Sequence, residues 1–330
     1  MKLIYRQMIA ALMMGFVFPW MILGVVSGIA ARQAQTDVPQ ISEAPASTVL
    51  HEETTSDIKL DVVTPDGTLV MALEKYVAGV VLAEMPAEFE PEALKAQAVV
   101  ARTYALRRME QGKKHENADV CTDPNCCQGY RSPEDYVSRG GSEEAVSKIR
   151  AAAEATSGQV LTYDGNLIEA TYFSCSGGQT EDALAVWGAD IPYLQSIHSP
   201  GEEKAAHYTD TVTLTVEEFR SSVDASLPAD PYSWFGAVTY TDGGGVDTIR
   251  IGDKTYKGTQ VRNMLSLRST DFTIRYTGKN IEIVTHGFGH RVGMSQYGAD
   301  AMAVAGSSYA EILAHYYQGT ALEDYPSMRN

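Results

Sequence analysis

The sequence predicts an α+β fold in which mixed helices and short strands surround a substrate cleft, preceded by one N-terminal transmembrane helix. Helical and strand-like patterns follow one another in mixed order, whereas a doubly wound sheet needs regular alternation. The 330 residues are 44% hydrophobic and 21% charged, a globular composition long enough for one or two cores. A long uncharged segment near the start is typical of a membrane helix.

This uncharged segment covers residues 8–30. Its 23 residues would form roughly 34 Å of helix, enough to cross a hydrocarbon layer of about 30 Å. Lys2 and Arg6 precede it, so the positive-inside rule predicts a cytoplasmic tail at 1–7 and places the rest of the chain outside the cytoplasm. A signal peptide cleaved near Ala30 is the alternative, and it leads to the same compartment.

The rest of the chain divides into a linker and a folded part. Residues 31–57 are polar, contain two prolines and show no sustained period, which is typical of a flexible linker. Residues 58–330 are predicted to form one extracytoplasmic domain, in which 206–280 is a candidate inserted lobe.

Hydrophobic periodicity and turn residues place the elements of this domain in order. A hairpin is expected at 58–73, a helix that ends before Pro86 at 73–85, and an alanine-rich helix at 91–108. Loops are expected at 113–140 and 186–200. The remaining helices are expected at 142–156, 215–223, 258–266, 294–305 and 308–317, and the strands at 159–163, 167–173, 236–242, 247–251, 271–277 and 280–285.

The charge balance excludes one class of partner. The formal net charge is −16, and no cluster of Lys and Arg offsets the acidic excess. Because binding to phosphates needs a basic field, the sequence predicts no nucleic-acid partner.

Glu84 is the first candidate for chemistry. It lies at the end of the 73–85 helix among apolar residues that include Leu82 and Met85. An isolated glutamate is most often a solvated surface carboxylate. In an apolar environment its pKa would instead rise, so that it could hold a proton near neutral pH and act as a general acid.

Two basic residues follow on the alanine-rich helix. Lys95 and Arg102 are seven positions apart and therefore share one face, with Val99 between them. They could form a solvated stripe, or they could grip a polar or anionic ligand beside Glu84. Spacing alone does not choose between the two interpretations.

A histidine and three cysteines lie close together in the 113–140 loop. His115, Cys121 and Cys127 are spaced at intervals of six, and Cys126 precedes Cys127 directly. Imidazole and thiolate are preferred zinc ligands. In an extracytoplasmic protein, a disulfide from Cys121 to Cys126 or Cys127 is an equal alternative. Cys175 is most simply a small buried thiol.

The segment from Val284 to Gly306 combines glycines with many polar side chains. Its G-x-G-x-x-x-G spacing does not match a dinucleotide-binding loop, and too little chain follows for a second βαβ strand. The polar residues exceed what a packing loop needs, although His290 could equally be a structural histidine. These residues are His286, His290, Arg291, Ser295, Gln296 and Tyr297.

Four blocks of the sequence resemble the stage II sporulation protein D family. They are EMPAEFEPEALKAQAVVARTYAL at 84–106, CTDPNCCQGY at 121–130, VWG…PYL at 186–194 and GHRVGMSQYGADAMA at 289–303. With the chain between them, they cover roughly residues 75–329. The single membrane anchor at the start is also a feature of the family.

This resemblance implies a lytic transglycosylase whose catalytic domain is 58–330. Such an enzyme cleaves the β-1,4 bond between N-acetylmuramic acid and N-acetylglucosamine in peptidoglycan and leaves a 1,6-anhydromuramic product. The resemblance assigns catalysis to Glu84 and one zinc ion to His115, Cys121 and Cys127. The expected substrate-binding residues are Lys95, Arg102, Tyr104, His290, Ser295, Gln296 and Tyr297.

The resemblance also implies partners and a location. The enzyme would act on glycan strands already stripped of peptides, together with a sporulation cell-wall amidase and a membrane scaffold protein during engulfment of the forespore. It would be a single-pass protein of the mother-cell membrane that faces the septal wall.

The residues fit a transglycosylase because such an enzyme needs only one carboxyl group, whereas an ordinary glycosidase uses two. Glu84 would protonate the glycosidic oxygen and then accept a proton from the C6 hydroxyl of the sugar. Two other functions remain open from the sequence. One is a zinc-dependent cell-wall amidase, and the other is a non-enzymatic scaffold that binds peptidoglycan or activates an amidase.

Overall fold

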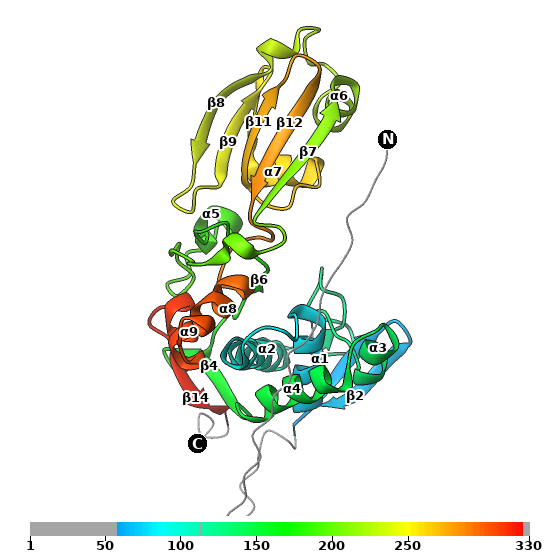
Figure 1. The fold of residues 1–330 in the computed structure, drawn as a ribbon, viewed down its shortest axis with the longest axis vertical. Helices are drawn as coiled ribbons and strands as arrows, with labels where there is room; N and C mark the ends of the chain where they lie inside the picture. The colour runs from blue at the N-terminus through cyan, green and yellow to red at the C-terminus, as the bar shows by residue number, and fades with distance from the viewer. Residues whose placement is uncertain (1–57, 113, 326–330) are drawn as a thin grey trace, which may run out of the picture. The chain divides into compact units, whose positions relative to one another are not determined.

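The computed structural model describes residues 58–112 and 114–325 (Figure 1). The predicted cytoplasmic tail, anchor and linker at 1–57 lie outside the described residues. Within the described ranges, none of the helices has both the length and the apolar character needed to cross a bilayer. The predicted α+β class is confirmed, because helices and short sheets follow one another in mixed order.

The first hydrophobic core forms around helix α2 (Pro91–Glu110). Pro91 occupies the first turn, where a missing N–H costs nothing, and Arg107 and Arg108 lie in the last turn. The many alanines of α2 are buried and small, so neighbouring elements approach it closely. Those neighbours include α1 (Leu73–Glu84), α4 (Glu143–Glu154), α8 (Gln296–Val304) and α9 (Tyr309–Tyr316).

Two small sheets complete this first core. The predicted hairpin is present as β1 (Lys59–Thr64) and β2 (Gly67–Ala72), and the short strand β3 (Val120–Cys121) pairs parallel to β1. The other sheet has the order β14-β4-β5, formed by Ala321–Asp324, Gln159–Tyr163 and Asn166–Leu167.

A second core lies within residues 209–286, around the buried rings of Phe219 and Trp234. It contains two three-stranded sheets, of order β10-β9-β8 and β11-β12-β7. Its elements are β7 (Thr209–Thr215), α6 (Val216–Val223), η3 (Pro231–Ser233), β8 (Phe235–Tyr240), β9 (Val246–Ile251), β10 (Lys254–Lys257), α7 (Gly258–Met264), β11 (Asp271–Tyr276) and β12 (Asn280–His286).

A short parallel pair brings the C-terminal glycine-rich segment to the middle of the chain. Strand β6 (Tyr172–Phe173) pairs with β13 (Met294–Ser295), so that Tyr172 lies opposite Met294. The predicted strand at 167–173 is therefore wrong as one unit, because β5 pairs with β4 while β6 pairs with β13. The helix predicted at 294–305 begins at Gln296 because Ser295 is its N-cap.

Short helices also lie within or next to segments that the sequence predicts as loops. Helix α3 (Pro133–Ser138) begins after Ser132, whose side chain caps it, and α5 (Ala183–Trp187) is capped in the same way by Asp182. Both are too short to show a helical period in the sequence. The short helix η2 (Glu202–Lys204) lies in the connection toward the second core.

Arg102 fixes the elements of the first core to one another. Its guanidinium is fully buried and forms a two-pronged ion pair with Glu74 of α1, at 2.6 and 2.9 Å. It also donates to the backbone carbonyls of Gln159 and Ala153. A buried guanidinium with four such hydrogen bonds connects α2 to α1, α4 and β4.

We expect Arg102→Met to destabilise the folded protein by about 3–5 kcal/mol, because it leaves the Glu74 carboxylate without its partner and removes the hydrogen bonds to the carbonyls of Gln159 and Ala153. Denaturant unfolding of the two proteins measures this difference in the free energy of unfolding. Lys95→Met on the same helix is the control and should change it by less than about 1 kcal/mol. Equal effects of the two substitutions would contradict the structural role of Arg102.

Candidate functional site

Glu84 is the last residue of α1 and lies in a half-buried position before the Met85–Pro86 turn. The backbone N–H of Gly129 donates to its Oε1 at 2.6 Å. The hydroxyl of Tyr172 donates a second hydrogen bond to the same carboxyl group. The carboxyl group is therefore held from two sides, by the loop that follows the cysteines and by strand β6.

Burial raises the pKa of Glu84 above its ordinary value of 4.5, and the hydrogen bonds from Gly129 and Tyr172 partly oppose this effect. No basic side chain is among the causes of the shift. A carboxyl group in this state retains its proton closer to neutral pH than a solvated one does, which is the property a general acid needs.

The segment 128–131 is fixed against α1 by aromatic and backbone contacts. The ring of Tyr130 stacks on that of Tyr76 with a centroid separation of 5.8 Å, and the N–H of Arg131 donates to the Gly79 carbonyl at 2.9 Å. A Cβ atom at Gly79 would lie 2.1 Å from the Tyr130 ring, so this approach requires glycine. The position of the Gly129 N–H beside Glu84 follows from this packing.

Four possible metal ligands gather next to this segment. The ligand atoms of His115, Cys121, Cys126 and Cys127 all lie within 4.8 Å of one another. His115 Nε2 is 3.3 Å from the Cys127 sulfur and 3.9 Å from the Cys126 sulfur. In tetrahedral zinc sites, neighbouring N and S ligands are about 3.5–3.8 Å apart.

The four cysteines within the described residues are all free thiols, so neither disulfide considered from the sequence is present. Cys126 joins the three ligands predicted from the sequence. The sequence indicated Cys126 through its position next to Cys127. Two adjacent cysteines do not easily form a disulfide with each other, so both thiols remain available as metal ligands. Cys175 lies elsewhere, fully buried and donating to Glu202 at 3.4 Å.

The predicted substrate-binding residues of α2 are occupied by contacts within the protein. Lys95 pairs with Glu92 at 2.6 Å and lies over the Tyr309 ring, while Arg102 is fully buried against Glu74. Among the described residues, neither of the two forms a hydrogen bond or ion pair with Glu84. The two therefore do not form a shared basic face, and Arg102 is a structural cross-link instead of a ligand-binding residue.

Tyr104 lies next to the cysteine cluster. Its buried side chain carries the Arg108 guanidinium over its ring at 4.7 Å and is also within hydrogen-bonding range of Cys127. Burial raises the pKa of the Tyr104 hydroxyl, with a further contribution from the Cys127 thiol. The structure thus places this predicted substrate-binding residue beside the candidate metal ligands.

His290 forms hydrogen bonds with two backbone groups. Nδ1 accepts from the Val292 N–H at 3.1 Å, and the ring also hydrogen-bonds the backbone of Tyr172. Burial, together with the nearby Arg262, lowers the pKa of His290 to about 4. The imidazole is therefore neutral at pH 7 and acts on its neighbours through packing and hydrogen bonds.

The three predicted residues that follow differ in their environments. Ser295 is fully buried and caps α8 by accepting from the Gly298 N–H at 3.2 Å, which is a structural role. Gln296 is buried, and its Nε2 has no hydrogen-bond partner within the described residues. The half-buried Tyr297 ring packs edge-on against Phe89 at 5.0 Å, in the turn that follows Glu84.

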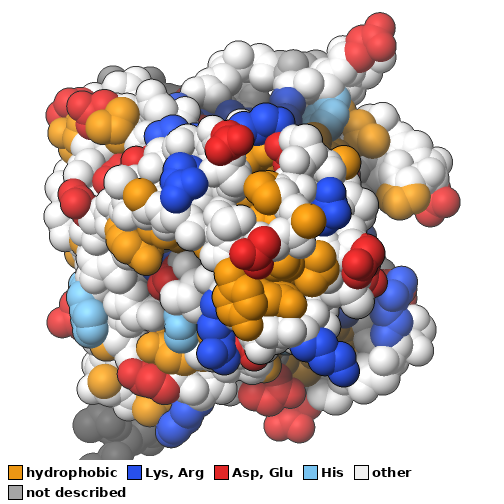
Figure 2. Space-filling view, turned by 90° about the horizontal axis from the view of Figure 1, so that it is seen from above, with side chains coloured by type: hydrophobic (Ala, Val, Ile, Leu, Met, Phe, Trp, Pro, Cys, Tyr) orange, Lys and Arg blue, Asp and Glu red, His pale blue; other side chains and the backbone are white. Residues whose placement is uncertain are grey.

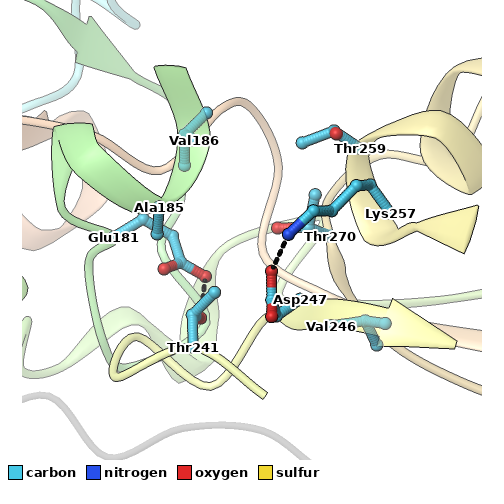
Figure 3. A pocket seen from close by; sticks show the side chains of 9 residues that line it. All are labelled: Glu181, Ala185, Val186, Thr241, Val246, Asp247, Lys257, Thr259 and Thr270. Atoms are coloured by element: carbon cyan, nitrogen blue, oxygen red, sulfur yellow. Dashed lines mark hydrogen bonds and ion pairs between the residues drawn. The ribbon is translucent and has the colours of Figure 1, made fainter. Parts of the chain in front are cut away.

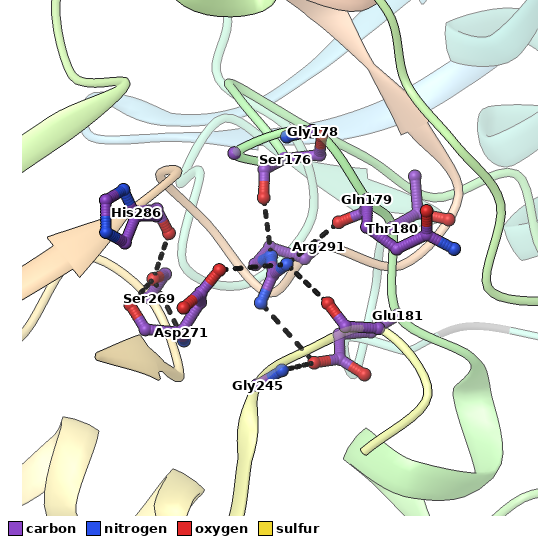
Figure 4. Close-up of polar contacts among 12 residues, drawn as sticks. Ser176, Gly178, Gln179, Thr180, Glu181, Gly245, Ser269, Asp271, His286 and Arg291 are labelled. Atoms are coloured by element: carbon purple, nitrogen blue, oxygen red, sulfur yellow. Dashed lines mark hydrogen bonds and ion pairs between the residues drawn. The ribbon is translucent and has the colours of Figure 1, made fainter. Parts of the chain in front are cut away.

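Arg291 and His286 also form contacts within the protein. The guanidinium of Arg291 is buried and donates to the carbonyls of Ser176, Gln179 and Gly243, with the carboxylates of Glu181 and Asp271 nearby (Figure 4). It connects the 176–181 loop to the loops of the second core. His286 contacts Thr209 across the β12–β7 pair at 3.2 Å.

A separate small pocket lies between α5 and the start of β9 (Figure 3). Thr241 donates to Glu181 Oε1 on one side, and Lys257 pairs with Asp247 at 2.8 Å on the other. None of the predicted site residues lines this pocket. Its lining residues are Glu181, Ala185, Val186, Thr241, Val246, Asp247, Lys257, Thr259 and Thr270.

On the face shown in Figure 2, basic and acidic side chains are interspersed and do not gather into a single basic patch.

Comparison with known proteins gives a consistent result. A family model described as "Stage II sporulation protein" matches residues 67–163, which include Glu84 and the four candidate metal ligands. The chain is 38% identical over 301 residues to stage II sporulation protein D of Bacillus amyloliquefaciens, covering 90% of this chain and 84% of that protein. It is 39% identical over 308 residues to stage II sporulation protein D of Bacillus subtilis (strain 168), covering 91% and 89%. An amidase enhancer of B. subtilis is 30% identical over 306 residues, covering 75% of this chain and 40% of that protein.

We expect Glu84→Gln to make the folded protein more stable than the wild type at pH 7. Because the folded-state pKa is raised above the ordinary value of 4.5, the wild type loses stability as the pH rises from that value through the folded-state pKa. Glutamine avoids this loss and can still accept from the Gly129 N–H. Unfolding by denaturant at pH 7 and pH 4 measures the effect. The advantage of the variant should shrink toward pH 4; a variant that is no more stable than the wild type at pH 7 would contradict the raised pKa.

Proposed function

Since the chain belongs to the stage II sporulation protein D family, we propose that it serves in sporulation as a lytic transglycosylase that cleaves peptidoglycan glycan strands. The family relation supports the role in sporulation and the association with the cell wall. The reaction is supported by one observation above all. Glu84 is a half-buried carboxyl group with a raised pKa, held by the Gly129 N–H and the Tyr172 hydroxyl.

The proposed reaction uses this one carboxyl group twice. Protonated Glu84 gives its proton to the glycosidic oxygen as the bond from that oxygen to C1 of the muramyl residue breaks. The C6 hydroxyl of the same residue attacks C1, and the carboxylate of Glu84 takes up the hydroxyl proton. Glu84 is thereby returned to its starting state, and no water is consumed.

The neighbours of Glu84 match this cycle. Burial favours the protonated form before the first transfer, while the two hydrogen-bond donors stabilise the carboxylate that exists between the transfers. The pKa of the Tyr172 hydroxyl is raised by burial and by Glu84, so this hydroxyl remains protonated and continues to donate. The proposed mechanism needs no second carboxyl group.

We further propose that one zinc ion binds His115, Cys121, Cys126 and Cys127. The donor set is the one zinc prefers, and the four ligand atoms gather within 4.8 Å of one another. A bound zinc ion would cross-link the 115–127 loop and leave no open position for a water molecule. Because Gly129 follows two residues after Cys127, this cross-link would help to hold the N–H that contacts Glu84. Four protein ligands favour this structural role over a zinc amidase.

The proposal includes the setting of the reaction. We propose that residues 8–30 anchor the protein in the mother-cell membrane and that the catalytic domain faces the septal wall. A cell-wall amidase would supply strands without peptides, and a membrane scaffold protein would hold the two enzymes together. The similarity to an amidase enhancer supports a link to amidase function.

Glu84→Gln should lower the rate of anhydromuramic product formation by about two to four orders of magnitude, because it removes the proton that general acid catalysis needs. Mass spectrometry of peptide-free glycan strands after digestion measures the product. Glu88→Gln, at an exposed position in the same turn, is the matched control and should retain the wild-type rate. Stem peptides released from intact peptidoglycan would instead indicate an amidase, and unchanged strands with the wild type would indicate a scaffold.

Cys126→Ser and Cys121→Ser are each expected to reduce the zinc content and to lower Tm by roughly 5 °C or more, because loss of a ligand weakens a cross-link that contributes to folding. Elemental analysis and thermal unfolding measure the two quantities. Cys175→Ser, which lies outside the cluster, should keep its zinc. Full zinc content in the Cys126 variant would exclude Cys126 as a ligand.

A further inference from the structure

Trp187 is a solvent-exposed tryptophan at the end of α5. Its side chain is 43% exposed, and Gly188 in a left-handed conformation ends the helix directly after it. The other tryptophan among the described residues, Trp234, is fully buried in the second core. An exposed indole on an ordered element presents a large apolar face that is available to a ligand.

The ring of Trp187 is held by a rigid support. It packs against the ring of His290 with a centroid separation of 5.3 Å, and Phe173 contacts the same imidazole at 5.7 Å. The ring of His290 is hydrogen-bonded to the backbone of Val292 and Tyr172, and its pKa of about 4 keeps it uncharged at neutral pH. The indole therefore rests on a neutral, fixed aromatic surface and is already ordered before any ligand binds.

His290 also connects Trp187 to the carboxyl group of Glu84 through Tyr172. His290 hydrogen-bonds the backbone of Tyr172, and the side chain of Tyr172 hydrogen-bonds Glu84. The β6–β13 pairing fixes Tyr172 next to Met294, four residues after His290. Trp187 is thus connected to the carboxyl group of Glu84 through two residues, His290 and Tyr172.

We propose that Trp187 is a sugar-binding residue that stacks on the apolar face of a pyranose ring of the glycan strand, away from the bond that is cleaved, and that His290 is its positioning residue. This inference rests on the proposed function and adds a second contact point for the same substrate. A flat indole offers an apolar face and a polar N–H, which matches a pyranose ring with its C–H faces and peripheral hydroxyl and acetamido groups. Leu184 and Trp187 are the large apolar side chains that α5 exposes, which is few for a protein interface.

Tryptophan fluorescence tests this binding directly. The full chain carrying Glu84→Gln, which should consume the substrate about two to four orders of magnitude more slowly, is titrated with peptide-free glycan strands. We expect a saturable change in emission that disappears when Trp187→Phe is added, because Trp20 and Trp234 remain in both proteins. His290→Ala should weaken the binding of glycan. It should also shift the emission of the free protein to longer wavelength, and this shift should be absent from a protein that also carries Trp187→Phe.

Steady-state kinetics provide the second readout. Trp187→Ala in the otherwise wild-type chain should raise KM for long peptide-free strands by about five- to tenfold and change kcat by less than about twofold. Tyr240→Ala is the matched control, because Tyr240 is an exposed aromatic residue in the second core region, and it should leave KM unchanged.

The outcomes separate this inference from the proposed function. If the wild type forms anhydro products while Trp187→Ala leaves KM unchanged and Trp187→Phe leaves the fluorescence titration unchanged, the sugar-binding role is excluded and the transglycosylase remains. If the fluorescence of Trp187 changes on addition of glycan but no anhydro product forms, the transglycosylase reaction is excluded and the sugar-binding role of Trp187 remains. An effect of Trp187→Ala that appears only when a partner amidase is present would show a protein contact and overturn the inference.

Discussion

The site depends on the hydrogen bond from the Gly129 N–H to Glu84, in a position where the carboxyl group has lost part of its water. Partial burial alone would leave the ionised form of Glu84 without stabilisation, and full exposure would leave the group ionised at neutral pH. The Gly129 N–H and the Tyr172 hydroxyl stabilise the ionised form of Glu84, while burial keeps its pKa raised. The same group can then release a proton and take it back within one reaction.

Much of the surrounding structure serves to place this donor. The stacking of Tyr130 on Tyr76 and the close approach at Gly79 hold the 128–131 segment on α1, and the cluster of His115 and three cysteines lies just before it. Arg102 keeps α1 fixed to α2 through Glu74. The charged residue in the middle of the alanine-rich helix is therefore explained by the rigidity of the site and not by contact with a ligand.

The sequence predicted the parts of the site that depend on residue type. A glutamate among apolar residues pointed to Glu84, and a preference for soft ligands pointed to His115, Cys121 and Cys127. Helical spacing placed Lys95 and Arg102 on a common face, but it could not show that Arg102 faces Glu74 in the core, because burial is decided by tertiary packing. For the same reason, the hydroxyl of Tyr172 and the N–H of Gly129 gave no signal, since each acts through a contact distant in sequence. The α+β class was predictable from element order, whereas the split of strand 167–173 depended on pairing partners that local patterns do not show.

The central claim is that Glu84 holds its proton in the folded enzyme more strongly than a solvated glutamate does. A ¹³C NMR titration of the glutamate side-chain carboxyl groups, with Glu84→Gln used to assign the signal of Glu84, measures its pKa directly. The account predicts a pKa above the ordinary 4.5, and a pKa at or below that value would contradict it.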